Sequence, residues 1–95
     1  YVRSGCEAAF LDYCAGPLEG LVEVYPSQLL RDWGFFGTGP AHPRFAERIG
    51  DYCLLPKGNR IIRQWLPFEE RHDLIGQHGG LTESEMLVPL CLFHA

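Results

Sequence analysis

Clustered basic residues are missing from this sequence. Its 8 lysine and arginine residues are outnumbered by 12 acidic residues, the formal net charge is −4, and no basic run occurs. Proteins that bind nucleic acid polymers need such clusters to neutralise the phosphate backbone. We therefore expect no nucleic acid polymer as a partner.

A hydrophobic run of membrane-spanning length is also absent, since crossing the hydrocarbon core takes about 20 apolar residues. The longest apolar stretch, from Met86 to Phe93, is the length of a strand and is interrupted by Pro89. The chain opens on Tyr1 without an initiator methionine or a leader-like segment. We expect a cytoplasmic protein without a membrane partner, and a C-terminal fragment of a longer chain.

Close cysteine pairs, which hold zinc knuckles or act in redox motifs, are missing as well. The 4 cysteines, Cys6, Cys14, Cys53 and Cys91, are widely spaced. Disulfides need an oxidising compartment, which nothing in the sequence indicates. We therefore expect four reduced, partly buried thiols.

The remaining composition is typical of a folded domain. In 95 residues the chain has 46% hydrophobic and 13% aromatic residues, which is enough apolar surface to offset the entropy of ordering. We expect a single domain over residues 1–95. A core of this size is marginal without a partner, a metal or a larger parent protein.

The first predicted element is a helix that begins at a capping box. Ser4 is the expected N-cap and Glu7 lies three residues later. Gly16, in a left-handed cap, and Pro17 are expected to end the helix. The apolar face of this helix is made of Cys6, Phe10, Tyr13 and Cys14.

A strand and a second helix are predicted next. Residues 21–25 are β-branched and aromatic, as in strands, and residues 27–33 form a short helix closed by Gly34. Residues 34–40 are a glycine-rich loop with two phenylalanines. This loop lacks the Lys-Ser/Thr ending of a phosphate-binding P-loop, so we expect its rings to fix it to the body or to a neighbouring lobe.

The second half is predicted to contain a helix, a hairpin and a final strand. A helix starts with Pro43 at its first position and runs to about Arg48, before Gly50. Residues 51–55 and 60–65 are strand-like, and residues 56–59 have hairpin-turn chemistry.

A charged stretch at residues 69–73 is expected to be a solvated loop. Thr82 and Glu85 form a second capping box. A buried strand is predicted at residues 86–93, with Pro89 at an edge or bulge position. Together the elements predict an α/β fold whose strands extend a larger sheet; in isolation they would give an α+β arrangement.

One histidine stands apart from the other three. His78 lies between Gly76-Gln77 and Gly79-Gly80, and glycines let the backbone approach a ligand closely. Neutral imidazole is a good zinc ligand, although a lone loop histidine is more often a surface residue. From the residues alone, both interpretations stay open.

Residues 78–90 read His-Gly-Gly-Leu-Thr-Glu-Ser-Glu-Met-Leu-Val-Pro-Leu. This segment resembles the closing motif of bacterial type I phosphodiesterase / nucleotide pyrophosphatase proteins, members of the alkaline phosphatase superfamily. A second similarity lies at residues 42–59, with His42-Pro43-Arg44-Phe45, Gly50-Asp51 and the hairpin turn. The resemblance covers about residues 24–93 and implies the C-terminal portion of an alkaline-phosphatase-like fold.

The resemblance further implies a metal-dependent phosphoester hydrolase with two zinc ions, or manganese, and a Thr or Ser nucleophile. His78 matches the last metal-ligand histidine, with Gly76, Gly79 and Gly80 as the supporting loop. The nucleophile and most metal ligands would precede Tyr1. We therefore expect no catalytic residue within this chain, no zinc held by it alone, and no hydrolysis of the parent enzyme's phosphoester substrate by it alone.

Other hypotheses remain. The chain could be a free-standing structural or binding module derived from that family. In the isolated domain, exposed apolar edges could drive a homodimer. It could also be a small zinc-stabilised domain, although His78, Cys91 and His94 have the spacing of no closed structural zinc site. We expect His42 to be a helix-entry residue and His72 to be solvated.

Overall fold

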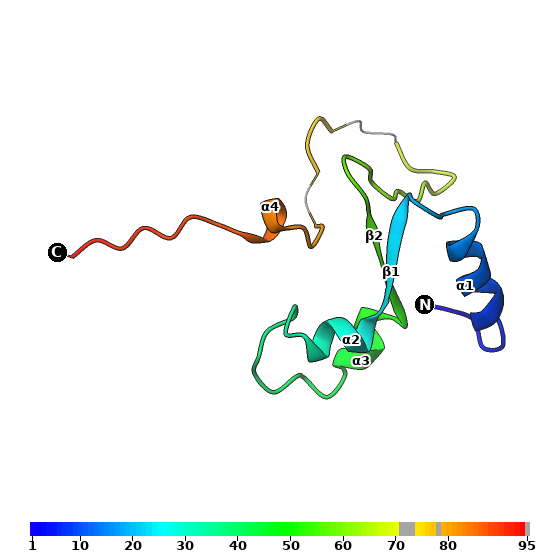
Figure 1. Cartoon of the computed structure of the whole chain (residues 1–95), viewed down its shortest axis with the longest axis horizontal. Helices are drawn as coiled ribbons and strands as arrows, with labels where there is room; N and C mark the ends of the chain where they lie inside the picture. Colours follow the sequence, from blue (N-terminus) through cyan, green and yellow to red (C-terminus); the bar gives the residue numbers. More distant parts are fainter. Residues whose placement is uncertain (71–73, 78, 95) are drawn as a thin grey trace. The chain divides into compact units, whose positions relative to one another are not determined.

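The computed structural model describes residues 1–70, 74–77 and 79–94. Within those residues the chain forms short helices and a two-stranded antiparallel sheet, a mixed α+β arrangement (Figure 1). The chain divides into two compact units, Tyr1–Arg60 and Ile61–Ala95. None of the helices in the described residues has the length and apolar character needed to cross a bilayer.

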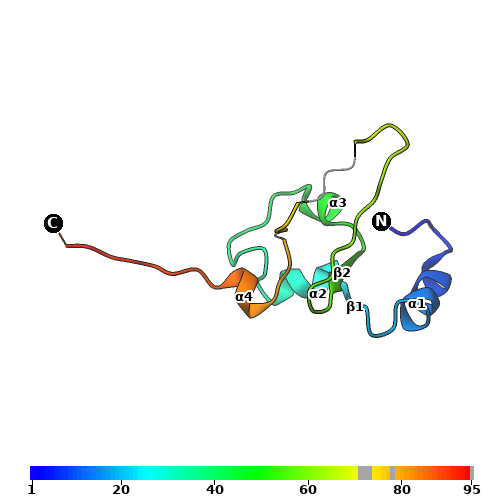
Figure 2. The same cartoon turned by 90° about the horizontal axis from the view of Figure 1, so that it is seen from above.

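The first unit contains most of the regular structure. Its elements are α1 (Glu7–Ala15), β1 (Val22–Pro26), α2 (Ser27–Asp32), α3 (Phe45–Ile49) and β2 (Tyr52–Pro56). Each was predicted from local sequence, with boundaries that differ slightly. In Figures 1 and 2, α2 and α3 lie together at one end of the two strands.

The strand pairing differs from the prediction. β2 pairs with β1, with Val24 opposite Leu54, and the predicted partner at residues 60–65 forms no strand. The predicted hairpin is therefore wrong. The Pro-Lys-Gly-Asn turn favours a local chain reversal, but strand pairing depends on which apolar faces meet, and β1 meets β2 with Val22 and Val24 half-buried.

Pro26 and Pro56, at the strand ends, occupy positions at which the backbone N–H would make no hydrogen bond to the other strand. The Ser27 N–H donates to the Asp51 carbonyl at 2.9 Å. Because hydrogen-bonded and non-hydrogen-bonded pairs alternate in an antiparallel ladder, the Pro26–Tyr52 pair is a non-bonded one. The Val22–Pro56 pair lies an even number of positions along the ladder from the Pro26–Tyr52 pair, so it is also a non-bonded pair. Both prolines therefore face the outer edges of the sheet, where they also discourage further strand addition.

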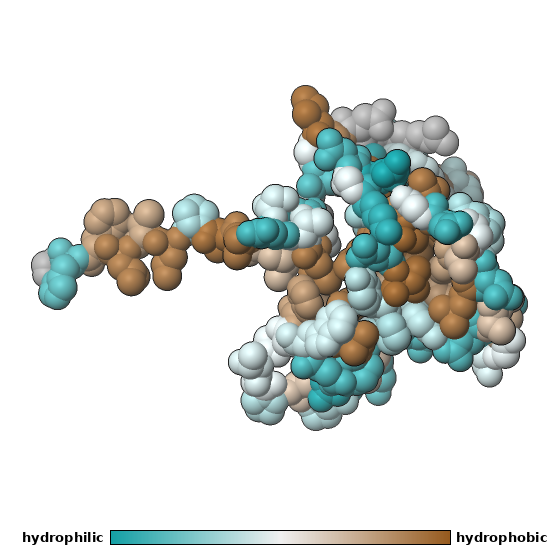
Figure 3. Space-filling view, viewed as in Figure 1, coloured by the Kyte–Doolittle hydropathy of each residue, from teal (hydrophilic) through white to brown (hydrophobic). Residues whose placement is uncertain are grey.

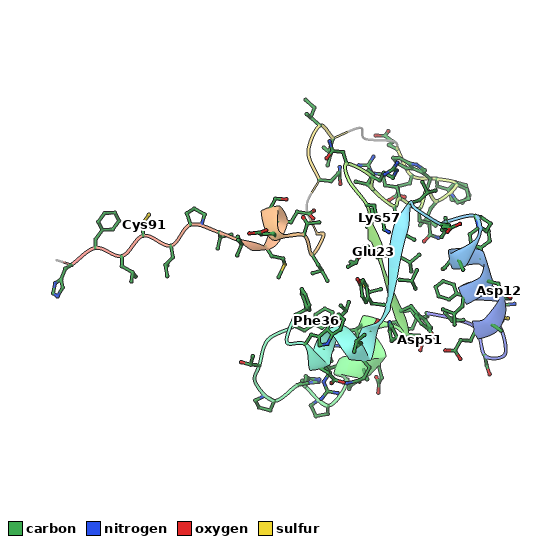
Figure 4. All side chains as sticks on the ribbon, in the orientation of Figure 1. Asp12, Glu23, Phe36, Asp51, Lys57 and Cys91 are labelled. Carbon is green, nitrogen blue, oxygen red and sulfur yellow. The ribbon has the colours of Figure 1, made fainter. Side chains whose placement is uncertain are left out.

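A charged pair crosses the sheet as well. Lys57 Nζ lies 3.6 Å from a carboxylate oxygen of Glu23, and Figure 4 labels Glu23 on β1 and Lys57 directly after β2. Both are about half exposed, so solvent screens the pair and it adds little stability.

The core of the first unit is small and centres on α2. Leu30 is 1% exposed, and Ser27 is buried beside it at the start of the helix. The Ser27 hydroxyl donates to the Ile49 carbonyl at 3.2 Å, which joins α2 to the end of α3. Because so few side chains are buried, Leu30 makes a disproportionate contribution to the stability of this unit.

The start of α1 corrects the first capping prediction. The helix begins at Glu7, with Cys6 at the N-cap position and no side-chain cap. Gly5 has a φ of 78° and forms a turn in which the Cys6 N–H donates to Arg3, so Ser4 lies before the helix. Glu7 accepts a hydrogen bond from the Tyr52 hydroxyl instead.

The end of α1 was predicted correctly in position but not in geometry. The helix stops at Ala15, but Gly16 has a φ of −106° and is not left-handed. Its N–H donates to the Asp12 carbonyl at 3.0 Å, which closes the last turn without a left-handed residue. Pro17 then prevents the helix from continuing.

Tyr52 connects α1 to β2. Its ring packs on Phe10 with centroids 5.1 Å apart, and its hydroxyl donates to the Glu7 carboxylate. That hydrogen bond, together with some burial, raises the pKa of the Tyr52 phenol. The N-terminal segment is fixed nearby, because the Val2 N–H donates to Asp51 at 2.7 Å.

α2 ends before Gly34, as predicted, and the structure shows that it does so in a Schellman motif. The Phe35 N–H donates to Leu30 and the Gly34 N–H donates to Arg31, at 3.1 and 2.9 Å. Gly34 has a φ of 83°, a left-handed conformation that is unstrained only for glycine. This motif sets the direction in which the glycine-rich loop leaves the helix.

The entry to α3 differs from the prediction in one respect. Pro43 lies in the turn before the helix instead of at its first position. His42 does act at the entry, as expected, because its carbonyl accepts from the Phe45 N–H at 2.8 Å. Its ring Nδ1 accepts from the Arg44 N–H at 3.1 Å.

All four cysteines carry free thiols. Cys14 is buried, and Cys53 is half-buried, which raises the pKa of its thiol. Cys6 and Cys91 are exposed, so the expectation of partial burial is wrong for these two. Cys6 lies at the N-cap of α1, outside the face that packs inward, and Cys91 lies in an extended segment.

The second unit contains one short helix, α4 (Glu83–Met86), in its described residues. Residues 87–94 form no strand and no helix. The predicted buried strand is therefore wrong: Leu90, Leu92 and Phe93 are 81%, 86% and 91% exposed. Figure 3 shows this segment as a largely apolar surface. It forms no strand because no described part of its own unit offers the ladder partner that a strand requires.

Candidate functional site

The candidate metal ligand, His78, lies outside the described residues, as does His72. The three glycines of its predicted supporting loop are described. Gly76 has open space where a side chain would begin, as has Gly79, which also has a φ of 123°. Such a backbone leaves room for a ligand to approach and resists side chains at Gly79.

Gly80 is closely covered by an acidic side chain. Its N–H donates to the Glu85 carboxylate at 3.2 Å, and a Cβ placed on Gly80 would overlap that carboxylate. Glycine at this position therefore allows the contact that folds the loop back onto α4.

The second predicted capping box is confirmed. The Thr82 hydroxyl donates to a Glu85 carboxylate oxygen at 2.6 Å, and the Thr82 N–H donates to the same carboxylate at 3.4 Å. Thr82 and Glu85 together cap a helix of four residues, which is too short to persist by propensity alone. The side chains of the closing motif thus organise the turn that follows His78.

The ionised form of Glu85 is favoured by these bonds. The hydrogen bond from the Thr82 hydroxyl lowers the pKa of Glu85, with further contributions from the N–H groups of Thr82 and Gly80. A carboxylate with a lowered pKa supports the folded turn above the ordinary glutamate pKa, and that support is lost as the pH falls through the lowered pKa. The turn is therefore most ordered near neutral pH.

Replacing Glu85 with alanine is expected to open this turn. Alanine is a good helix former, so a loss of order would reflect the missing cap. Amide hydrogen exchange measured by NMR should show lower protection factors at Gly80 and Thr82 in this variant. Acid should lower the protection factors of the same amides in the unmodified chain, once each rate is divided by the intrinsic exchange rate at that pH. Glu83→Ala, on the same helix, is the matched control; equal effects of the two variants would contradict the role given to Glu85.

A complete metal site is not present in the described residues. Across residues 1–70, 74–77 and 79–94, no three His, Cys, Asp or Glu side chains come together in a way that could hold a metal ion. The only sequence-predicted ligand, His78, is outside that part of the chain. The described residues therefore do not fit a zinc or manganese ion by themselves.

The remaining histidines do not add to such a site. His42 lies in the first unit, at the entry to α3. His94 lies in the exposed C-terminal segment with Cys91. The hypothesis of a zinc site built from His78, Cys91 and His94 involves a residue outside the described part of the chain and stays a hypothesis.

Comparison with protein family models, curated proteins and solved structures gives no match for this chain. The likeness to the phosphodiesterase / nucleotide pyrophosphatase proteins therefore stays an expectation that rests on the motif residues quoted above.

The sequence did not predict a cavity beside the glycine-rich loop at residues 34–40. The glycine-rich loop encloses a cavity of about 470 Å³ together with the end of α2 and Phe45. Figure 4 labels Phe36 on this loop. The available signal was the combination of three glycines with Arg31 before them and His42 after them, but only the fold shows that the loop curves around an open space.

Proposed function

We propose that the chain is the C-terminal lobe of a metal-dependent phosphoester hydrolase of the phosphodiesterase / nucleotide pyrophosphatase type, and that His78 is one of its metal ligands. The carrying observation is the sequence of residues 78–90, which matches the closing motif of that family position by position. The organisation of the motif supports the proposal, because Thr82 and Glu85 cap the turn that follows His78.

Under this proposal the residues around His78 have a positioning role. Gly79, with its φ of 123°, brings the backbone into a conformation that side chains resist, and Glu85 holds Gly80 from the other side. A ligand next to a turn that is held by such a contact loses less entropy when it binds a metal. Zinc or manganese, when bound, would supply Lewis-acid chemistry, with the other ligands coming from residues that precede Tyr1.

The lobe proposal also accounts for the exposed C-terminal segment. Residues 87–93 are apolar but have no strand partner among the described residues of their own unit. In an alkaline-phosphatase-like α/β fold they would join a larger sheet, which would bury them and provide their backbone hydrogen bonds.

The test compares the chain with a protein extended upstream along its reading frame. The chain alone is expected to show no turnover of a nitrophenyl phosphodiester with added zinc or manganese. The extended protein is expected to show turnover, and His78→Ala should reduce it by at least about a hundredfold, because the metal would lose a direct ligand. His72→Ala, a nearby histidine in the charged stretch, is the matched control.

Two results would overturn the proposal: turnover by the chain alone that His78→Ala abolishes, or an extended protein in which His78→Ala and His72→Ala have equal effects. A free-standing structural or binding module is the second candidate, favoured by the local α+β core of residues 1–60. It predicts a reading frame that encodes no upstream nucleophile or metal aspartates, and a chain that is stable as a monomer or dimer.

A further inference from the structure

The glycine-rich loop places unpaired backbone donors in the lining of the cavity. Within the described residues, the backbone N–H groups of Thr38, Gly39 and Ala41 donate to no other group of the chain. All three residues line the cavity. Backbone N–H groups left unpaired in a curved, glycine-rich loop are typical of sites that bind anions.

A positive charge lies at the edge of the same cavity. Arg31 lines it, and the contact of its guanidinium within the described residues is a long bond of 3.4 Å to the Gln28 side chain. No carboxylate lies within ion-pair distance of Arg31 in that part of the chain, whereas Arg44 pairs with Glu47 at 2.7 Å. Guanidinium groups bind carboxylates and phosphates through paired hydrogen bonds.

The tautomer of His42 adds another donor. Its Nδ1 accepts a hydrogen bond from the Arg44 N–H at 3.1 Å, so the proton of the neutral ring resides on Nε2. His42 lines the cavity, and Nε2 is the nitrogen left for a ligand. Since that nitrogen donates, it too favours an acceptor group on the ligand.

The cavity also has an acidic residue and an apolar wall. Asp32 lines it, with one carboxylate oxygen accepting from the Gln28 amide at 2.8 Å, so the single negative charge is balanced by Arg31. Phe36 and Phe45 form the apolar wall, packed edge to face with ring centroids 5.3 Å apart. A ligand with an apolar body and one negative end could contact the two rings with its body and Arg31 with its charge.

We propose that this cavity binds a small organic oxyanion, a carboxylate or phosphate monoester with an apolar body, and that Arg31 and the loop N–H groups contact the oxyanion. The volume of about 470 Å³ is suited to a molecule of this size. The site lies wholly within Tyr1–Arg60 and does not use His78, so it goes beyond the hydrolase proposal and can hold or fail independently of it.

The experiment titrates the full chain with phenyl phosphate, benzoate and phenol, and follows the backbone amides by two-dimensional NMR. Both anions should produce saturable shifts at Thr38, Gly39 and Ala41, while neutral phenol, with the same ring, should bind at least about tenfold more weakly because it lacks the charged acceptor. The tighter of the two anions identifies the site as one for phosphate monoesters or for carboxylates.

Arg31→Gln keeps the length of the side chain and removes its charge. It is expected to weaken anion binding by about tenfold or more. Arg48→Gln is the matched control, because Arg48 is a helical arginine of the same unit that does not belong to the cavity lining. Equal weakening by both variants, absent saturation with either anion, or equal affinity for phenol and phenyl phosphate would overturn the proposal. The comparison of phenol with phenyl phosphate uses the unmodified chain, so it tests the proposal even if Arg31→Gln fails to fold.

Discussion

Leu30→Ala is expected to unfold most of the Tyr1–Arg60 unit at room temperature. Leu30 is 1% exposed and is the largest fully buried side chain among the described residues. Truncating a buried leucine costs about 2–5 kcal/mol, and a core in a chain this small supplies only about 3–5 kcal/mol in total. The cost therefore matches most of the stability of the unit.

Urea unfolding followed by near-ultraviolet circular dichroism measures this loss, because Trp33 lies in an aromatic cluster with Tyr25 and Phe35. Leu29→Ala, the preceding residue on the same helix, removes the same atoms from a position that is 36% exposed. It should lower the free energy of unfolding much less. If the two variants have equal midpoints, the burial of Leu30 does not determine the stability of this unit.

Paired replacement of Leu90 and Leu92 by glutamate is expected to abolish self-association of the chain. These two side chains are 81% and 86% exposed, in a segment that forms no strand with any described residue. Exposed apolar segments of this kind drive association. Burying one leucine contributes about 1.5–3 kcal/mol. Losing both should weaken a homodimer by roughly a hundredfold or more.

The position of Pro89 makes the prediction more specific. In an extended chain, backbone groups of alternate residues point to opposite edges. Val88, Leu90 and Leu92 therefore present their N–H groups on one edge, while the other edge is interrupted by Pro89, which has none. The segment should pair along a single edge, which favours a dimer over open-ended assembly.

Sedimentation velocity over a range of concentrations tests this prediction. The unmodified chain should show a concentration-dependent dimer, and the Leu90→Glu, Leu92→Glu variant should stay monomeric. Ile75→Glu places the same charge on another exposed apolar residue of the same unit and should leave the dimer in place. A chain that is monomeric at every concentration would exclude the homodimer.

Local sequence was a good guide wherever the decisive contacts are close along the chain. Gly34 predicted the end of α2, because the Schellman motif involves only the residues from Leu30 to Phe35. Thr82 and Glu85 predicted the start of α4 for the same reason. The predicted capping box failed because the turn at Gly5 leaves Ser4 before the helix. Its other member, Glu7, binds Tyr52, a residue far along the chain that no local pattern could reveal.

The candidate sites also differ in whether local sequence predicted them. The turn around Gly79 and Gly80, with its cap, follows from the closing motif itself. The cavity between Arg31, the glycine-rich loop and Phe45 did not follow from any motif. Its lining comes from a helix end, a loop and the next helix, and the volume they enclose depends on how the loop closes between the two helices.

By itself the sequence determined where α2 ends, where α4 begins and which glycine-rich segment contains His78, because capping bonds and glycine conformations span only a few residues. Only the tertiary structure decided that β2 pairs with β1, that residues 60–65 and 87–93 form no strand, and that Leu30 fills the core. Those outcomes depend on which distant apolar surfaces meet. The same strand-like segment is buried or exposed according to whether a partner is present, and its own residues do not encode that.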